Sequence, residues 1–100
     1  LSYGQQKLLE FIRVLMTDPQ LILLDEPAAG VNRTLLNDLL NAIRQLRDQG
    51  KTILIVEHDM KVVMGLCETV FVLDYGEKIA EGPPEVIQRD EQVIEAYFGR

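Results

Sequence analysis

Four consecutive aliphatic residues at positions 21–24 are followed directly by Asp25, Glu26 and Pro27. An apolar run this short indicates either a buried strand or a piece of buried helix, because periodicity alone cannot separate the two. Pro19 before the run and Pro27 after it favour a strand, since proline interrupts regular structure at both ends. We therefore predict a fully buried strand over residues 21–26 that carries two carboxylates at its C-terminal end.

The position of these carboxylates favours a role in chemistry. In open α/β sheets, ligands bind outside the carboxyl ends of the strands. An apolar strand that ends in acidic residues is also the usual source of the Mg²⁺-holding carboxylate in nucleotide hydrolases. A strand that merely ends in a polar turn has the same sequence, so residues 21–27 alone leave both interpretations open.

A second strand is predicted over residues 52–57, which are rich in β-branched side chains, and His58 and Asp59 follow its C-terminal end. A lone histidine is more often a surface or structural residue than a functional one. Here, however, we expect His58 at the same sheet edge as Asp25 and Glu26. Its expected position therefore favours a functional role.

The chain begins with a predicted helix capped by Ser2. Its apolar residues recur at helical spacing and predict a core-facing stripe: Leu8, Leu9, Ile12, Leu15 and Met16. A helix N-terminus that contains Ser2 and Gly4 can bind an anion, because its unpaired N–H groups and its dipole favour phosphate. Many helices begin in this way with nothing bound, so this feature is weak evidence by itself.

The remaining pattern predicts an α/β fold. A helix is expected over about residues 34–49, a third strand over 69–74, a hairpin turn at Tyr75-Gly76 and an edge strand at 78–80. Two short helical pieces follow, at residues 84–88 and about 90–98. The tripeptide Gly50-Lys51-Thr52 imitates the end of a phosphate-binding P-loop, but it precedes a strand instead of opening a helix. No other Gly-Lys-Ser/Thr is present, so the sequence contains no P-loop.

Composition excludes several classes of protein. The net charge of −6 argues against binding nucleic acid by general electrostatic attraction. The longest aliphatic runs are much too short to span a bilayer. Cys67 is the only cysteine, so neither an internal disulfide nor a cysteine metal cluster can form, and we interpret it as a small buried apolar residue.

Taken together and in this order, these segments resemble the ATP-binding subunits of ABC transporters. Residues 1–5 resemble the signature motif, residues 21–26 the Walker B strand with its catalytic glutamate, residues 28–32 the D-loop, and His58 the switch histidine. Tyr3, in place of the usual glycine, is similar to the branched-chain amino acid importer subgroup, as are Ala28-Ala29-Gly30 and residues 93–99. Asn32 stands where many members of the family carry aspartate.

The resemblance implies a P-loop NTPase-like (RecA-like) fold, a parallel sheet flanked by helices. Residues 1–100 are then the C-terminal portion of the nucleotide-binding domain, and the P-loop strand and N-terminal half are absent. The resemblance implies that Asp25 holds Mg²⁺, that Glu26 orients or deprotonates the attacking water, and that His58 contacts the γ-phosphate. It also implies that four residues contribute to the ATP site of the opposite subunit: Ser2, Gly4, Gln5 and Asn32.

The function implied is ATP hydrolysis that powers import of a solute across a membrane, and the resemblance to the importer subgroup implies that this solute is a branched-chain amino acid. The implied partners are a second ATP-binding subunit in a head-to-tail dimer and transmembrane permease subunits, with no nucleic acid, at the cytoplasmic face of the inner membrane. Two alternatives remain at this point: a soluble ABC ATPase in DNA maintenance or translation, and an inactive structural or dimerising remnant.

The missing P-loop leads to two expectations for residues 1–100 alone. We expect no measurable ATPase, because the P-loop supplies most phosphate contacts. In proteins of this family the P-loop strand lies between the strands at residues 52–57 and 69–74, so its absence leaves a gap in the sheet with an unpaired strand edge on each side. Unpaired backbone groups are costly when buried, and exposed edges invite pairing with another chain. We therefore expect that the gap closes by rearrangement, that the chain self-associates, or that it belongs to a larger molecule.

Overall fold

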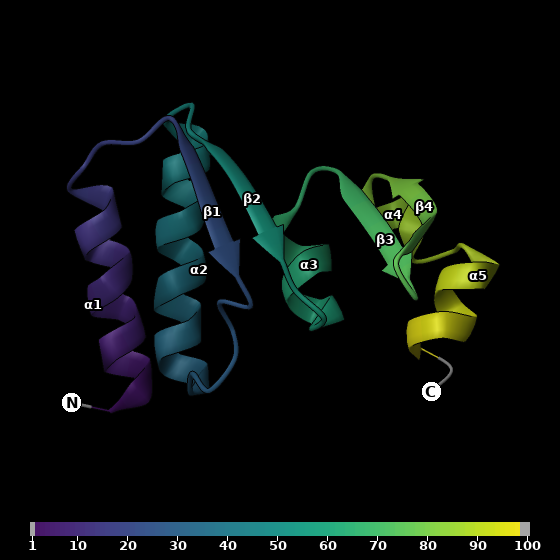
Figure 1. Cartoon of the computed structure of the whole chain (residues 1–100), viewed down its shortest axis with the longest axis horizontal. Coiled ribbons are helices and arrows are strands. Elements are labelled where there is room, and N and C mark those ends of the chain that lie inside the picture. Colours follow the sequence, from purple (N-terminus) through teal and green to yellow (C-terminus); the bar gives the residue numbers. More distant parts are fainter. Residues whose placement is uncertain (1, 99–100) are drawn as a thin grey trace. The chain divides into compact units, whose positions relative to one another are not determined.

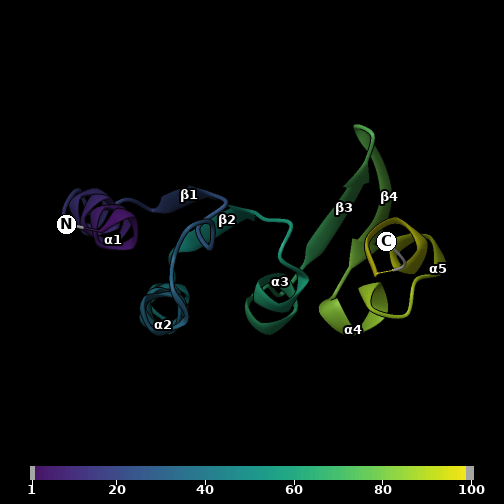
Figure 2. The ribbon, with the colours of Figure 1, turned by 90° about the horizontal axis from the view of Figure 1, so that it is seen from below.

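The computed structural model describes residues 2–98. Leu1 of the predicted signature segment and Gly99 of the predicted C-terminal segment therefore lie outside the described residues. The chain divides into two compact units, residues 1–59 and residues 60–100. Figures 1 and 2 trace the elements of each unit, and each unit is described by itself.

The first unit contains two helices and two parallel strands. Its elements are α1 (Tyr3–Leu15), β1 (Leu21–Asp25), α2 (Arg33–Asp48) and β2 (Thr52–Val56). The two strands pair in register from Leu21↔Thr52 to Asp25↔Val56. Figure 2 shows α2 below the β1–β2 sheet, so this helix covers one face of it. The predicted order of elements is confirmed, and the parallel pairing brings the carboxyl ends of both strands to one edge.

The predicted burial of these strands is wrong. In β1 only Ile22 is buried, whereas Leu21 and Leu23 are 61% and 66% exposed. In β2 no residue is buried, and every second one is exposed. The reason is that side chains alternate between the two faces of a sheet, and α2 covers only one of them. Burial on both faces needs a second layer, which residues 2–59 do not supply.

The predicted core-facing stripe of α1 is wrong in part: Leu8 and Leu15 are half-buried, but Leu9, Ile12 and Met16 are exposed. The buried residues of this helix are Gly4 and Phe11, whereas Ile12 and Met16 are 46% and 81% exposed. A Cβ atom added to Gly4 would lie 3.0 Å from Cδ1 of Leu35. The missing side chain of Gly4 therefore lets α1 approach α2 closely, and this approach selects a contact face that hydrophobic spacing alone does not reveal.

The second unit is a hairpin covered by short helices. Its elements are α3 (Met60–Leu66), β3 (Val70–Asp74), β4 (Glu77–Gly82), α4 (Pro84–Ile87), α5 (Glu91–Val93) and a π-helical turn, Ile94–Phe98. The strands are antiparallel and are joined at Tyr75-Gly76. Both of these residues have positive φ, 49° and 79°, as a two-residue type I′ turn requires. The predicted hairpin is confirmed.

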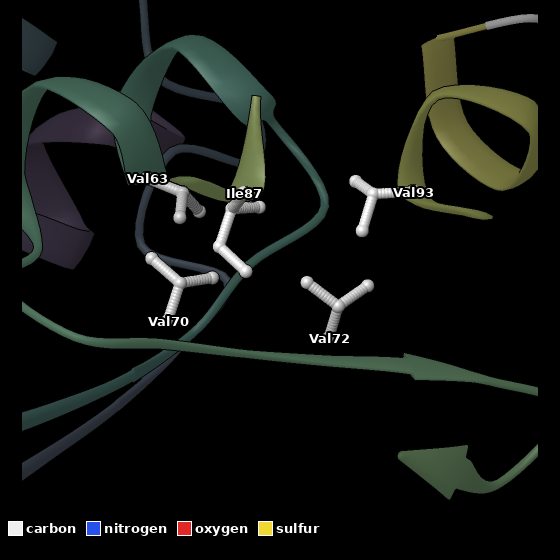
Figure 3. Close-up of a cluster of buried hydrophobic side chains, with 5 residues drawn as sticks. All are labelled: Val63, Val70, Val72, Ile87 and Val93. Atoms are coloured by element: carbon white, nitrogen blue, oxygen red, sulfur yellow. The ribbon is translucent and has the colours of Figure 1, made fainter. Parts of the chain in front are cut away.

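The core of this unit is small and entirely aliphatic. Five buried side chains point toward one another in Figure 3: Val63, Val70, Val72, Ile87 and Val93. They come from α3, β3, α4 and α5, so each of the α-helices described in this unit contributes to one cluster against the hairpin. Cys67 packs against this cluster and is partly buried, in agreement with its interpretation as a small apolar residue.

The described residues form two separate two-stranded sheets, β1–β2 and β3–β4. Each of these pairings uses one edge of β2 and one edge of β3, so closure of the expected gap by rearrangement stays a prediction. Self-association of the chain stays a prediction. Among residues 2–98, no helix combines the length and the apolar character that crossing a membrane requires.

Candidate functional site

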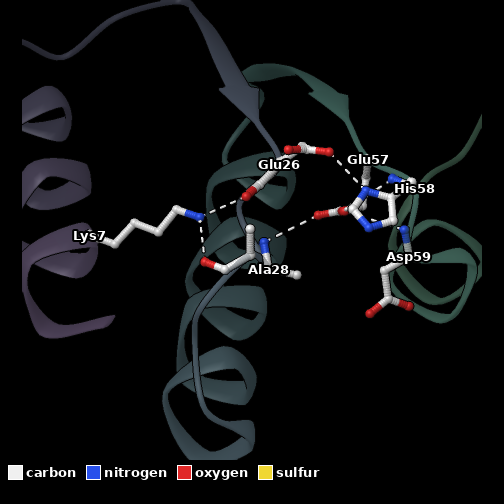
Figure 4. A network of polar contacts seen from close by, with 7 residues as sticks. Lys7, Glu26, Ala28, Glu57, His58 and Asp59 are labelled. Carbon is white, nitrogen blue, oxygen red and sulfur yellow. Dashed lines mark hydrogen bonds and ion pairs between the residues drawn. The ribbon is translucent and has the colours of Figure 1, made fainter. Parts of the chain in front are cut away.

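The carboxyl ends of β1 and β2 bring Glu26 and His58 into contact. The Glu26 N–H donates to the carbonyl of Val56 at 2.7 Å, which extends the sheet pairing by one residue. Beyond it, Oε1 of Glu26 lies 2.8 Å from Nδ1 of His58 (Figure 4). The Glu26 side chain is 49% exposed and that of His58 is 72% exposed. The expected proximity of these residues is thus observed, and solvent reaches both.

Glu26 has an unusual backbone conformation, with a φ of 48°. This left-handed region is costly for a residue with a side chain and persists only where the surroundings enforce it. The surroundings here are two hydrogen bonds to the Glu26 carbonyl, from Nζ of Lys7 at 2.7 Å and from the N–H of Ala29 at 3.1 Å. Outliers of this kind concentrate at functional sites, which supports a role for this residue.

Lys7 ties α1 to the loop that follows β1. In addition to the Glu26 carbonyl, its Nζ donates to the carbonyl of Ala29 at 2.9 Å (Figure 4). The same Nζ lies 5.6 Å from the centre of the Tyr3 ring. Lys7 was not predicted as a site residue, because it lies off the predicted apolar stripe of α1. Its spacing of three residues from the buried Gly4 is the signal that could have placed it on the contact face.

Glu57 is a second residue that the sequence analysis did not assign. Its side chain is only 1% exposed. Oε2 accepts from the N–H of Ala28 at 3.2 Å, and Oε1 accepts from the N–H groups of His58 and Asp59 at 3.0 and 3.3 Å (Figure 4). The feature of the sequence that could have identified Glu57 is its position, as an acidic residue between an apolar strand and a histidine.

Ser2, Gly4 and Gln5 lie together at the start of α1. The Ser2 hydroxyl accepts from the N–H of Gln5 at 3.1 Å, and the Gln5 side chain accepts from the N–H of Ser2 at 3.0 Å. These two bonds form a capping box. Gly4 is buried against α2. In this structure, therefore, the polar groups of Ser2 and Gln5 stabilise the helix end.

The Tyr3 ring lies against Gly30 in the loop after β1. A Cβ atom added to Gly30 would be 2.5 Å from Cε1 of Tyr3, and Gly30 itself has a φ of +71°. Asn32 follows in this loop and caps α2, since its Oδ1 accepts from the N–H of Leu35 at 2.9 Å. The structure thus places Asn32 at a helix terminus, outside the Glu26–His58 contact.

Asp25 is the residue predicted to hold Mg²⁺. It is exposed and ends β1. No group of three or more metal-ligating side chains occurs among residues 2–98. Mg²⁺ usually keeps several waters and is held by one or two carboxylates together with substrate phosphates. The exposed carboxylate of Asp25 fits that manner of binding.

Comparisons with known proteins agree with this geometry. Residues 1–29 match the family described as ABC transporter, and residues 77–100 match the family described as branched-chain amino acid ATP-binding cassette transporter. The high-affinity branched-chain amino acid transport ATP-binding protein LivG of Escherichia coli (strain K12) is 44% identical over 100 residues, which are 99% of this chain and 39% of LivG.

Solved structures give the same result. The ADP conformation of MJ1267, an ATP-binding cassette of an ABC transporter, matches with a TM-score of 0.84 and 39% identity, covering 100% of this chain and 41% of MJ1267. A dimeric post-hydrolysis state of the ATP-binding cassette MJ0796, bound to ADP and Pi, matches with a TM-score of 0.76 and 29% identity, covering 84% of this chain and 36% of MJ0796.

The parallel strands with their acidic and histidine ends define part of a P-loop NTPase fold of the ATP-binding cassette type. The chain belongs to the ABC transporter ATP-binding family. It spans 39% of the length of LivG and 41% of that of MJ1267.

Proposed function

We propose that the full-length protein hydrolyses ATP as a subunit of an ABC transporter, and that residues 1–100 are the C-terminal portion of its nucleotide-binding domain. The observation that carries this proposal is the 2.8 Å contact between Glu26 and His58 at the carboxyl edge of the parallel sheet. Family membership supports the reaction class, and the two exposed side chains are chemically suited to it.

Glu26 is the residue that acts on water. Its carboxylate is half exposed at an open sheet edge, so a water molecule can reach it and donate a hydrogen bond to it. A carboxylate in this position orients the water for in-line attack and accepts its proton. The hydrogen bonds that hold the Glu26 backbone fix the point from which the side chain projects.

His58 is the residue that contacts the γ-phosphate. When its Nδ1 donates to the ionised Glu26, the neutral ring keeps Nε2 as an acceptor. Nε2 can then donate to a phosphate oxygen only when the ring is protonated. Nδ1 of His58 faces Glu26, so Nε2 is the ring nitrogen that would contact a phosphate oxygen.

The remaining predicted site residues bind Mg²⁺ and ATP and orient them. Bound Mg²⁺ neutralises negative charge on the β- and γ-phosphates, and Asp25 is the carboxylate that would hold it. The start of α1, with Ser2, Gly4 and Gln5, presents a capped helix N-terminus to the ATP of a second subunit in a head-to-tail dimer. Asn32, at the end of the neighbouring loop, belongs to the same interface.

In the cell, the proposed protein sits at the cytoplasmic face of the membrane, bound to permease subunits, and powers uptake of a branched-chain amino acid. The match of residues 77–100 to the branched-chain amino acid family and the similarity to LivG support this solute class. Residues 1–100 alone are expected to be inactive, because they contain no phosphate-binding loop.

The test is phosphate release by the full-length subunit in the presence of Mg²⁺ and ATP. We expect hydrolysis, and a decrease in kcat of about 10²-fold or more in His58→Ala. Glu10→Gln, which changes an exposed residue of α1, should keep the wild-type rate. Absence of hydrolysis by the full-length subunit with its permease would contradict the proposal. Leucine uptake into proteoliposomes that contain the whole assembly tests the solute class.

A further inference from the structure

The buried carboxylate of Glu57 joins two segments that the sequence keeps apart. One of its oxygens accepts from Ala28, two residues beyond Glu26, and the other accepts from the N–H groups of His58 and Asp59. The side chain is 1% exposed, so water cannot replace these bonds readily. The loop after β1 and the segment after β2 thus share a single acceptor group.

We propose that Glu57 is a positioning residue that fixes Glu26 relative to His58. It accepts from backbone N–H groups of both segments, and its Oε1 also lies 3.7 Å from Nδ1 of His58. Its two oxygens accept three backbone hydrogen bonds of 3.0 to 3.3 Å, and leaving a buried partner of such a bond unsatisfied is costly. Three such bonds on one rigid, desolvated carboxylate hold the two segments in register beyond the point where the β1–β2 hydrogen bonds end.

Lys7 holds the same loop from the opposite side. Its ammonium group donates to the carbonyls of Glu26 and Ala29, whereas Glu57 accepts from Ala28, which lies between them. Lys7 therefore binds carbonyl groups of this short loop and Glu57 binds an N–H group between them, as Figure 4 shows. With α1 on one side and β2 on the other, the loop cannot shift without breaking a charge-assisted bond. This arrangement explains how the costly φ of Glu26 is maintained.

The variant Glu57→Gln should break the bond of residue 57 to Ala28 and keep its bonds to His58 and Asp59. We call these two sets of bonds together the Glu57 bridge. An amide keeps one accepting oxygen and replaces the other with an NH₂ group, which only donates. We expect the remaining oxygen to face His58 and Asp59, because two N–H groups point to that side. The NH₂ group then faces the N–H of Ala28, and that bond is lost while size and shape are conserved.

Glu57→Ser provides a second variant if the glutamine protein does not fold. A serine hydroxyl can accept from the N–H two residues later in a local turn, but it is too short to reach Ala28. Both variants therefore remove the link between the segments by different means. Glu10→Gln is the matched control, since it removes the same charge from an exposed position of α1.

The experiment combines amide hydrogen exchange with steady-state kinetics in the full-length protein. In Glu57→Gln we expect the Ala28 amide to exchange faster by on the order of 10-fold. The kcat should fall roughly 10- to 100-fold, as for a misplaced catalytic group, with KM for ATP unchanged. Glu10→Gln should change neither quantity.

Unchanged exchange at Ala28 in both Glu57 variants would overturn the proposal. Faster exchange at Ala28 with a wild-type kcat would also overturn it, because the link would then not position the catalytic pair. The kinetic consequence rests on the proposed ATPase function, but the exchange measurement does not. If the wild-type protein hydrolyses no ATP and Ala28 still exchanges faster in Glu57→Gln, the bridge is supported and the proposed function fails.

Discussion

Nδ1 of His58 lies 2.8 Å from Oε1 of Glu26, although 32 residues separate the two in the sequence. They meet because β1 and β2 are parallel and pair with Asp25 opposite Val56. Glu26 directly follows β1 and His58 lies two residues beyond the end of β2, so the register of the sheet sets the distance between them. A slip of one residue would turn every side chain of β2 to the other face and would separate His58 from Glu26.

Asn32 should stabilise α2 through its cap and not through a charge. Asn32→Ala removes the acceptor for the Leu35 N–H, and we expect it to lower the free energy of unfolding by about 0.5–2 kcal/mol. Asn32→Asp keeps the acceptor and should retain wild-type stability. Denaturant unfolding of the full-length protein checks both, and equal stability of the alanine and wild-type proteins would contradict the cap.

Gly30 should be more sensitive to substitution than Gly50, although both have positive φ, +71° and +92°. An alanine at either position carries the cost of a left-handed backbone, roughly 1–2 kcal/mol. Only at Gly30 would the added Cβ also meet the Tyr3 ring, at 2.5 Å, whereas nothing lies within 4 Å of it at Gly50.

Gly30→Ala should therefore lower the free energy of unfolding more than Gly50→Ala does. The additional Tyr3→Ala substitution should remove the difference, because it removes the ring. If the two glycine variants are equally destabilised, the contact between Tyr3 and Gly30 does not constrain this loop.

The order and type of the elements could be predicted from the sequence because they depend on local signals. Proline and glycine positions, apolar runs and the Tyr75-Gly76 turn each act within a few residues. The meeting of Glu26 and His58 could also be predicted, since parallel neighbouring strands end at one sheet edge. These predictions needed no knowledge of what covers the sheet.

Burial and the supporting contacts could not be predicted in the same way. Leu21 and Leu23 are as apolar as Ile22, but only a covering layer decides which of them is buried, and α2 covers a single face. The bonds of Lys7 to Glu26 and of Glu57 to Ala28 span 19 and 29 residues. Such contacts depend on the tertiary arrangement, and the local sequence around each residue does not indicate its distant partner.

Cys67 should make stability fall in alkaline solution, because burial raises the pKa of its thiol. Below the pKa of the unfolded thiol, about 8.5, both states keep the proton and Cys67 contributes no pH dependence. As the pH rises from that value to the higher pKa of the folded thiol, the unfolded chain releases its proton first, so unfolding becomes more favourable.

The free energy of unfolding, measured from pH 7 to pH 10, should therefore decline more steeply in the wild type than in Cys67→Ala. The alanine variant controls for tyrosine and lysine residues that titrate in the same range. Parallel curves for the two proteins would show that the thiol is not desolvated.

The most direct measurement is the rate of ATP hydrolysis by full-length Glu26→Gln compared with the wild type under single-turnover conditions, where product release does not contribute. Glutamine keeps the size of the side chain but accepts a proton poorly, so the rate should fall by about 10²- to 10⁴-fold, with ATP binding retained. A wild-type rate in Glu26→Gln would contradict the assignment of the Glu26–His58 pair as the centre of the reaction.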